Sequence, residues 1–125
     1  MNKDLIVLGG SDLQFLNLLS ARIKEAFPNK EIYTSNDAYD VYYKSYKEHP
    51  AIIILEKIFP QWDWDGYMIC KLLKRDSRFT DLKFILIADR RDKDIESIIE
   101  DPSVDKILFK VDGLDAIFDE IERLI

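Results

Sequence analysis

The sequence alternates short apolar runs with longer amphipathic stretches, and this order constrains the fold more than any other feature. Five runs predict strands: Leu5–Gly9, Glu31–Thr34, Ala51–Leu55, Lys83–Ala88 and Lys106–Lys110. The first, third and fourth runs are unbroken apolar segments. Such segments are typical of strands that are covered on both faces in a parallel sheet. We therefore expect these three strands to form the centre of the sheet.

The stretches between the runs carry apolar residues at helical spacing. The five stripes comprise Phe15, Leu16, Leu19, Ile23 and Ala26; Ala38, Val41, Tyr42 and Ser45; Ile69, Leu72 and Leu73; Ile95, Ile98 and Ile99; and Leu114, Ile117, Phe118, Ile121 and Leu124. Ser11 or Asp12 is expected to cap the first helix. Ser35 or Asn36 is expected to cap the second, and Gly113 to open the last.

Strict alternation of strands and helices predicts an α/β fold in which right-handed crossovers place helices on both faces of the sheet. We predict a three-layer, doubly wound, five-stranded parallel sheet with the strand order 2-1-3-4-5. The 125 residues fit one domain, which we expect to span residues 1–125.

Composition narrows the possible partners and the compartment. The net charge of −6 argues against a nucleic-acid-binding surface, because phosphate binding requires basic groups. The apolar run in "MNKDLIVLGG" is too short for a signal peptide, and no run approaches the ~20 residues that span a bilayer. We therefore expect a cytoplasmic protein that binds neither nucleic acid nor membrane.

In doubly wound sheets, function lies at the carboxyl ends of the strands. The residues that follow the central strands and the last strand are Gly9, Gly10, Ser11, Asp12, Glu56, Ala88, Asp89 and Lys110. Only a few of these residues carry chemically useful side chains. The most informative is Glu56, a lone carboxylate that ends the run "AIIILE".

Three segments together resemble the receiver domain of two-component response regulators, and the likeness covers essentially the whole chain. "HPAIIILEKIFP" is similar to the segment of receivers that ends their third strand on an aspartate phosphoacceptor. "DGYMICKLLKRD" is similar to the start of their third helix, and "DKILFK" to their fifth strand with its terminal lysine. The resemblance implies a signalling domain that contacts other proteins.

The resemblance also assigns positions to a phosphorylation pocket, and most of them are substituted. The phosphoacceptor position is Glu56, where the family has aspartate, and the lysine position is Lys110. The family's acidic pair falls on Gly10 and Ser11, or on Gly9 and Gly10 if the register slips by one. Asp12 fits the third acid of that region. Ala88 occupies the position of a threonine or serine.

This pocket predicts a degenerate receiver, or pseudo-receiver, that is not phosphorylated. Phosphoryl transfer to a carboxylate needs a divalent cation held by oxygen ligands, and the acidic pair is missing. We expect no catalytic residue, no metal and no cofactor. We expect Glu56 and Lys110 to form an ion pair, because burying either charge alone is costly. The predicted function is protein–protein interaction in bacterial two-component signalling, with an unidentified partner.

Other interpretations remain open at this point. The Glu56–Lys110 pair can be a plain structural ion pair without regulatory meaning. The stretch "GGSD" leads from a strand into a helix, which allows a flavodoxin-like binder of small anions or nucleotides, although Asp12 would lie where the anion should go. A third possibility is an unusual receiver that is still phosphorylated.

The segment "QWDW" makes the loop after the third strand longer than the receiver pattern and holds both tryptophans. We expect one of Trp62 and Trp64 to cap the core. The other is a candidate interface residue with an acidic rim from Asp63 and Asp65, because tryptophan is enriched at interaction hot spots. If both indoles only cap the core, the partner surface is expected on the fourth helix, fifth strand and fifth helix, a face that receivers commonly use.

Overall fold

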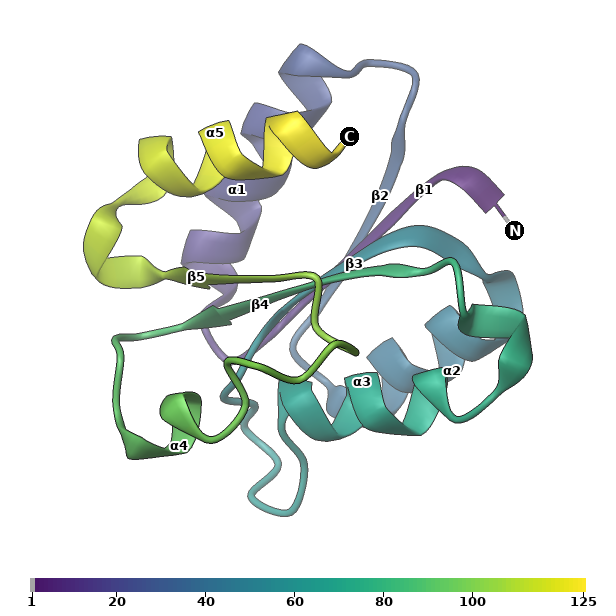
Figure 1. The fold of residues 1–125 in the computed structure, drawn as a ribbon. Coiled ribbons are helices and arrows are strands. Elements are labelled where there is room, and N and C mark those ends of the chain that lie inside the picture. The colour runs from purple at the N-terminus through teal and green to yellow at the C-terminus, as the bar shows by residue number, and fades with distance from the viewer. Residues whose placement is uncertain (1) are drawn as a thin grey trace.

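The computed structural model describes residues 2–125, in which five strands form one parallel sheet (Figure 1). The strands are β1 (Asn2–Gly9), β2 (Glu31–Ser35), β3 (Pro50–Glu56), β4 (Lys83–Ala88) and β5 (Lys106–Phe109). Their order is β2-β1-β3-β4-β5, and every pair of neighbours is parallel. The predicted fold class and strand order are confirmed.

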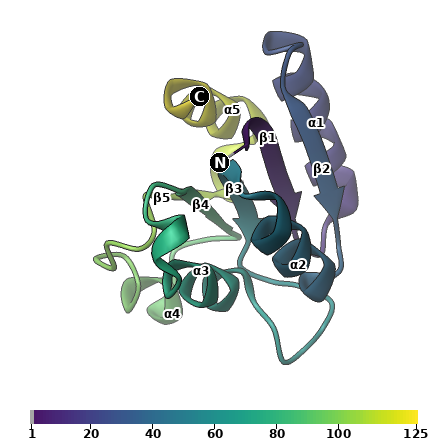
Figure 2. The same ribbon diagram turned by 90° about the vertical axis from the view of Figure 1, so that its right-hand side faces the viewer.

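Helices cover both faces of this sheet and form the outer layers. They are α1 (Leu13–Ala26), α2 (Ala38–Glu48), α3 (Gly66–Lys74), α4 (Lys93–Glu96) and α5 (Leu114–Leu124). The helices α1 and α5 lie on one face, and α2, α3 and α4 lie on the other (Figures 1 and 2). Among the described residues, no helix is long and apolar enough to cross a membrane.

Alternation along the central strands divides the core in two. Ile6 and Leu8 of β1 point to the layer that contains α1 and α5, whereas Leu5 and Val7 point to the layer that contains α2 and α3. All four side chains are buried, as are their equivalents in β3 and β4. Burial on both faces explains why these strands read as unbroken apolar runs.

Of the two predicted N-terminal caps, the one for α2 was wrong. The cap of α2 is Asp37 rather than Ser35 or Asn36, because the Asp37 carboxylate accepts a hydrogen bond from the Asp40 amide at 3.0 Å. Ser35 instead accepts from the Asp37 amide at 3.1 Å and shapes the turn before the helix. The cap of α1 is Asp12, one of the two residues predicted for it.

The fourth helical stripe does not form the predicted helix over its whole length. The helix α4 ends at Glu96, so that Ile98 and Ile99 lie in the turns that follow. Pro102 comes shortly after and disfavours helical backbone at the residue before it. The strand β5 also ends one residue earlier than predicted, because Lys110 begins a 3-10 helix that spans Lys110–Asp112.

Candidate functional site

The carboxyl edge of the sheet brings together three charged residues that are far apart in the sequence. Glu56 ends β3, Asp12 caps α1, and Lys110 follows β5. The Lys110 ammonium lies 2.5 Å from Glu56 Oε2 and 3.0 Å from Asp12 Oδ2. The predicted pairing of Glu56 with Lys110 is confirmed.

Asp12 contributes more to this cluster than the sequence suggested, since we expected Lys110 to meet one acid only. The backbone amide of Asp12 donates to Glu56 Oε1 at 2.8 Å. The Asp12 carboxylate caps α1 by accepting from the Phe15 amide at 3.1 Å, and its second oxygen accepts from Lys110. Two carboxylates therefore share one ammonium group, and the cluster carries a formal charge of about −1 when all three groups are ionised.

Burial sets the electrostatics of the cluster. Glu56 is only 3% exposed, and desolvation raises the pKa of its carboxyl despite the hydrogen bond from Lys110. Burial alone would lower the pKa of Lys110, but the hydrogen bonds to Glu56 and Asp12 raise it above its usual value. The amide of Phe15 and the Lys110 ammonium lower the pKa of Asp12. At neutral pH, Lys110 is therefore held in its charged form.

Gly10 lies against the Glu56 side chain. A Cβ atom at position 10 would lie 2.5 Å from both Cβ and Cγ of Glu56, a distance that non-bonded carbons do not tolerate. The backbone of Gly10 also has φ of +155°, a conformation that favours glycine. The Glu56 side chain thus fills the space into which a side chain at position 10 would extend.

The two remaining pocket positions add no acid or hydroxyl to the cluster. Ser11 is exposed, and its backbone amide donates to the Ile58 carbonyl at 3.0 Å. Ala88 ends β4 with a buried methyl group that belongs to the apolar core. Of the predicted pocket residues, only Glu56, Asp12 and Lys110 come together through polar side-chain contacts.

The donors of the cluster do not fit a magnesium ion. Each carboxylate oxygen of Glu56 and Asp12 already accepts a hydrogen bond from Lys110 or from a backbone amide. Mg²⁺ is bound through one or two carboxylates with waters that complete an octahedron, but here the Lys110 ammonium contacts both carboxylates where such an ion would have to lie. Within residues 2–125, no group of three or more His, Cys, Asp or Glu side chains is arranged to hold a metal ion.

The two tryptophans lie in the loop between β3 and α3 and have different surroundings. The loop is closed by a bridge between Ile58 and Asp65 and is tied to the start of α2, where the Gln61 side chain accepts from the Ala38 amide at 2.9 Å. Trp64 is partly buried against the core, whereas Trp62 is 94% exposed. The structure therefore has one indole in each of the two expected environments.

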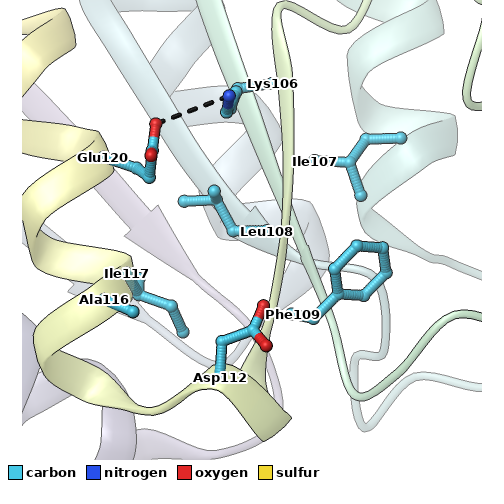
Figure 3. Close-up of a pocket in the computed structure, with 8 residues that line it drawn as sticks. All are labelled: Lys106, Ile107, Leu108, Phe109, Asp112, Ala116, Ile117 and Glu120. Carbon is cyan, nitrogen blue, oxygen red and sulfur yellow. Dashed lines mark ion pairs between the residues drawn. The ribbon is translucent and has the colours of Figure 1, made fainter.

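A groove of about 420 Å³ lies between β5 and α5 (Figure 3). The side chains that line it include Leu108 and Phe109 from β5 and Ala116 and Ile117 from α5. An ion pair between Lys106 and Glu120, with 3.4 Å between nitrogen and oxygen, spans the groove. This surface belongs to the alternative partner face that the sequence predicted.

The tyrosines of α2 form a surface feature that the predicted apolar stripe does not reveal. The segment "AYDVYYKSYKE" places four tyrosines on eleven residues, and three of their rings are exposed. The signal was visible as aromatic residues at positions 39, 43 and 46, outside the apolar stripe that predicts the buried face. Aromatic residues at exposed helix positions need an explanation of their own.

Comparisons with known proteins find the fold but no close sequence relative. No protein-family model matches the chain, and no curated protein sequence matches it. A solved signal receiver domain of a DNA-binding response regulator from Colwellia psychrerythraea is similar with a TM-score of 0.82 and 18% identity over 96% of each chain. A response regulator from Chloroflexus aurantiacus gives 0.80 and 15% identity over 98% of this chain and 97% of the other.

The phosphorylated cyanobacterial phytochrome response regulator RcpA is similar with a TM-score of 0.77 and 17% identity, over 98% of this chain and 91% of its own. These likenesses extend over nearly the full length of every chain compared. The chain therefore has the fold of response regulator receiver domains. Because a fold hosts many functions, its function must be argued from the site.

Proposed function

We propose that the chain is a receiver-like domain of bacterial two-component signalling that is not phosphorylated at Glu56 and acts by binding another protein. In this proposal it is a non-catalytic, cytoplasmic signalling module. The observation that carries the proposal is the closed cluster of Glu56, Lys110 and Asp12, in which the acceptor position is already engaged.

The chemistry of phosphorylation supports this proposal. A carboxylate that attacks a phosphoryl group needs a free oxygen and a cation that neutralises the transferred group. Glu56 Oε1 accepts from the Asp12 amide, and Oε2 is paired with Lys110. Freeing either oxygen would leave a buried charge without its partner, which is strongly unfavourable. Ala88 supplies no hydroxyl to bind a phosphoryl oxygen.

The test is incubation of the purified chain with a small phosphodonor such as acetyl phosphate and Mg²⁺, followed by intact-mass spectrometry. The expected result is an unchanged mass, because the cluster offers no free nucleophile and no metal ligands. Glu56→Gln serves as the matched control. A gain of one phosphoryl group in the parent that is absent from the control would overturn the proposal.

Trp62 is the first candidate for the contact with the partner. Its indole is almost fully exposed in a loop that is anchored to the body of the domain, and Asp63 beside it is exposed as well. Such an anchor suits a partner that offers an apolar pocket ringed by basic groups. The groove between β5 and α5 is the second candidate surface.

Paired substitutions distinguish these surfaces. Trp62→Ala should abolish capture of a partner purified with the parent domain and leave the melting temperature unchanged. Trp64→Ala should lower the melting temperature, because that indole packs against the core. Retained capture by Trp62→Ala, with loss of capture by Ala116→Arg in the groove, would move the contact to the β5–α5 face.

An anion-binding function finds less support at this site. The N-terminus of α1 would be the place for a phosphate or carboxylate ligand, because its free amides and dipole favour negative charge. The Asp12 carboxylate already accepts from the Phe15 amide there. A bound anion would also face the negative charges of Asp12 and Glu56 with only Lys110 to offset them.

A further inference from the structure

The helix α2 and its neighbours carry a continuous aromatic strip, defined by Tyr39, Tyr42, Tyr43, Tyr46, Trp64 and Phe79. The Tyr39 and Tyr43 rings stack at 6.2 Å between centroids, and the Tyr42 and Tyr46 rings lie 6.1 Å apart. Trp64 contacts Tyr39 and Tyr42 at one end, with centroid distances of 6.4 Å and 5.9 Å. Phe79 contacts Tyr46 at the other end at 6.0 Å.

Much of this strip faces solvent. Tyr39, Tyr43 and Tyr46 are 63%, 53% and 42% exposed. Given the area of a tyrosine, their exposed parts amount to on the order of 300 Å² per chain. An exposed patch of this size is comparable to the largest apolar patch of a typical monomer, which is often functional. Neither the core nor the cluster around Glu56 requires these rings to be aromatic.

Charges at the two ends of the aromatic strip have opposite signs. Near Trp64, the exposed carboxylates are Asp63 in the loop and Asp37 at the start of α2. Near Tyr46, the exposed Lys47 forms no ion pair among the described residues, whereas the Arg78 guanidinium, 4.8 Å from the centroid of the Tyr46 ring, is paired with Asp76 at 2.7 Å, so that Lys47 supplies the positive charge of this end. A partner surface of one sign would therefore be repelled at one end of the strip.

Because its two ends carry opposite charges, the aromatic strip is complementary to the strip of a second copy that is rotated by 180°. In a two-fold symmetric dimer, the same patch meets itself in reverse, so that the acidic end of one copy faces the basic end of the other. Tyr43 lies between the two ends and shares its helix face with Tyr39 and Lys47, at a spacing of four residues. Near the symmetry axis, Tyr43 would meet its own equivalent.

We propose that the aromatic strip binds a second copy of this chain, with the α2 helices antiparallel across a two-fold axis. This inference goes beyond the proposed function, because it concerns the isolated chain and not its signalling partner. The exposed tyrosines of both copies bury on the order of 600 Å² in total, and the charged rims add to this. This area lies below the roughly 1,200 Å² buried in stable interfaces, so the dimer that we propose is weak and reversible.

The proposal is tested by sedimentation velocity on the purified full chain, over concentrations up to on the order of 100 µM. The parent should change from monomer to dimer as its concentration rises. Tyr43→Ser should raise the dissociation constant at least about tenfold, because aromatic anchors near the centre of an interface carry most of its binding energy. Melting temperatures verify that each variant is folded.

A charge swap gives the sharper test, because it depends on the antiparallel arrangement. Asp63→Lys alone and Lys47→Glu alone should each weaken the dimer, since each places like charges opposite one another. The double variant, with both substitutions in one chain, should restore the dimer. Glu122→Lys on α5, which is exposed on the other face, is the matched control and should dimerise like the parent.

A chain that stays monomeric throughout the concentration range overturns the proposal. So does a dimer that Tyr43→Ser and both single charge changes leave intact, which would locate the contact elsewhere on the molecule. A dimer that is weakened by the single changes but not restored by the double variant also overturns it, because the two ends would then not face each other.

Discussion

The single positive charge of Lys110 is shared by two carboxylates, those of Glu56 and Asp12. Because there is one cation for two anions, the response of the cluster to substitution depends on Lys110. Its ammonium is the only positive side chain that pairs with Glu56 in the described residues. Desolvation raises the pKa of Glu56, so the ionised carboxylate is present in the folded chain at a cost that Lys110 offsets. Without the Lys110 ammonium, the free-energy cost of burying the Glu56 charge is no longer compensated.

Lys110→Met should lower the free energy of unfolding by about 3 kcal/mol at pH 7, because it leaves Glu56 buried without a partner. The loss should shrink as the pH falls towards and below 4.5, the ordinary value for a glutamate. A group whose folded-state pKa is raised stabilises the fold below its unfolded pKa, and this stabilisation is lost as the pH rises through the folded value. Urea unfolding at several pH values measures both effects.

Lys106→Met is the matched control for this substitution. Lys106 also pairs with a glutamate, Glu120, but at 3.4 Å and with both side chains substantially exposed. Its removal should cost roughly 0.5 kcal/mol at most, because exposed ion pairs contribute little. Equal stability losses in the two variants, or a Lys110→Met loss that does not depend on pH, would show that the Glu56 pair is solvated.

At the scale of single residues, the sequence predicted the pairing but not its full geometry. Glu56 and Lys110 were found because they follow strands whose carboxyl ends meet at one edge. The part played by Asp12 was missed because its position depends on the turn between Gly10 and α1. The contact of Gly10 with Glu56 is invisible in the sequence, since it depends on the direction of one side chain.

At the scale of elements, α3 holds the irregular segment that follows the short helix α4. The Tyr67 hydroxyl donates to the Asp101 carboxylate, and Lys71 lies 3.1 Å from the same carboxylate. The Cys70 thiol donates to the Ser103 carbonyl at 3.3 Å. Three residues on one face of α3 thus hold this segment through polar contacts.

Tyr67→Phe should lower the free energy of unfolding by about 1.5 kcal/mol at pH 7, the contribution of a hydrogen bond to a charged group. The Tyr67 hydroxyl is the main cause that lowers the pKa of Asp101. A carboxylate with a lowered pKa stabilises the fold above its unfolded value of 3.8, and this contribution is lost as the pH falls. Chemical unfolding at pH 7 and at acidic pH measures the change.

Tyr39→Phe is the control for this substitution, because it removes an exposed hydroxyl that is not hydrogen-bonded to a protein group in the described structure. It should leave stability unchanged at both pH values. If Tyr67→Phe behaves like this control, the segment after α4 is held by its apolar residues alone. Ile95 and Ile98, both buried, are the residues that would hold it.

Prediction of the helices succeeded for four of the five stripes and failed for the fourth. The stripe of α5 spans eleven residues, and Gly113 opens that helix as expected. The helix α4 ends at Glu96, and the fourth stripe is followed by a turn in which Asp101 accepts a hydrogen bond from the Ser103 amide at 2.8 Å. Local hydrogen bonds of this kind compete with helix formation.

At the scale of the whole molecule, strand order followed from the alternation of elements, whereas the proposed function depends on a few side chains at the carboxyl edge of the sheet. The carboxyl edge of this sheet carries Glu56, Asp12 and Lys110 in mutual contact. The fold alone therefore does not determine the function, which has to be argued from the side chains of the site.

The absence of suitable metal ligands in the cluster predicts the response of the whole molecule to Mg²⁺. Adding about 10 mM Mg²⁺ should leave the melting temperature unchanged, whereas a site with a dissociation constant of about 1 mM would add about 1.4 kcal/mol of stability. Thermal unfolding with Ca²⁺ and with matched ionic strength provides the controls. A saturable rise that Glu56→Gln removes would contradict the assignment of the site.

The contact between Gly10 and Glu56 also imposes an order on sequence change. With Glu56 in place, any side chain at position 10 would overlap it, so an acid cannot be introduced there first. Residue 56 must be shortened before residue 10 can gain a carboxylate, and that first step alone weakens the pairing with Lys110. Single substitutions that lead from this pocket to one with an acid at position 10 therefore pass through a less stable intermediate.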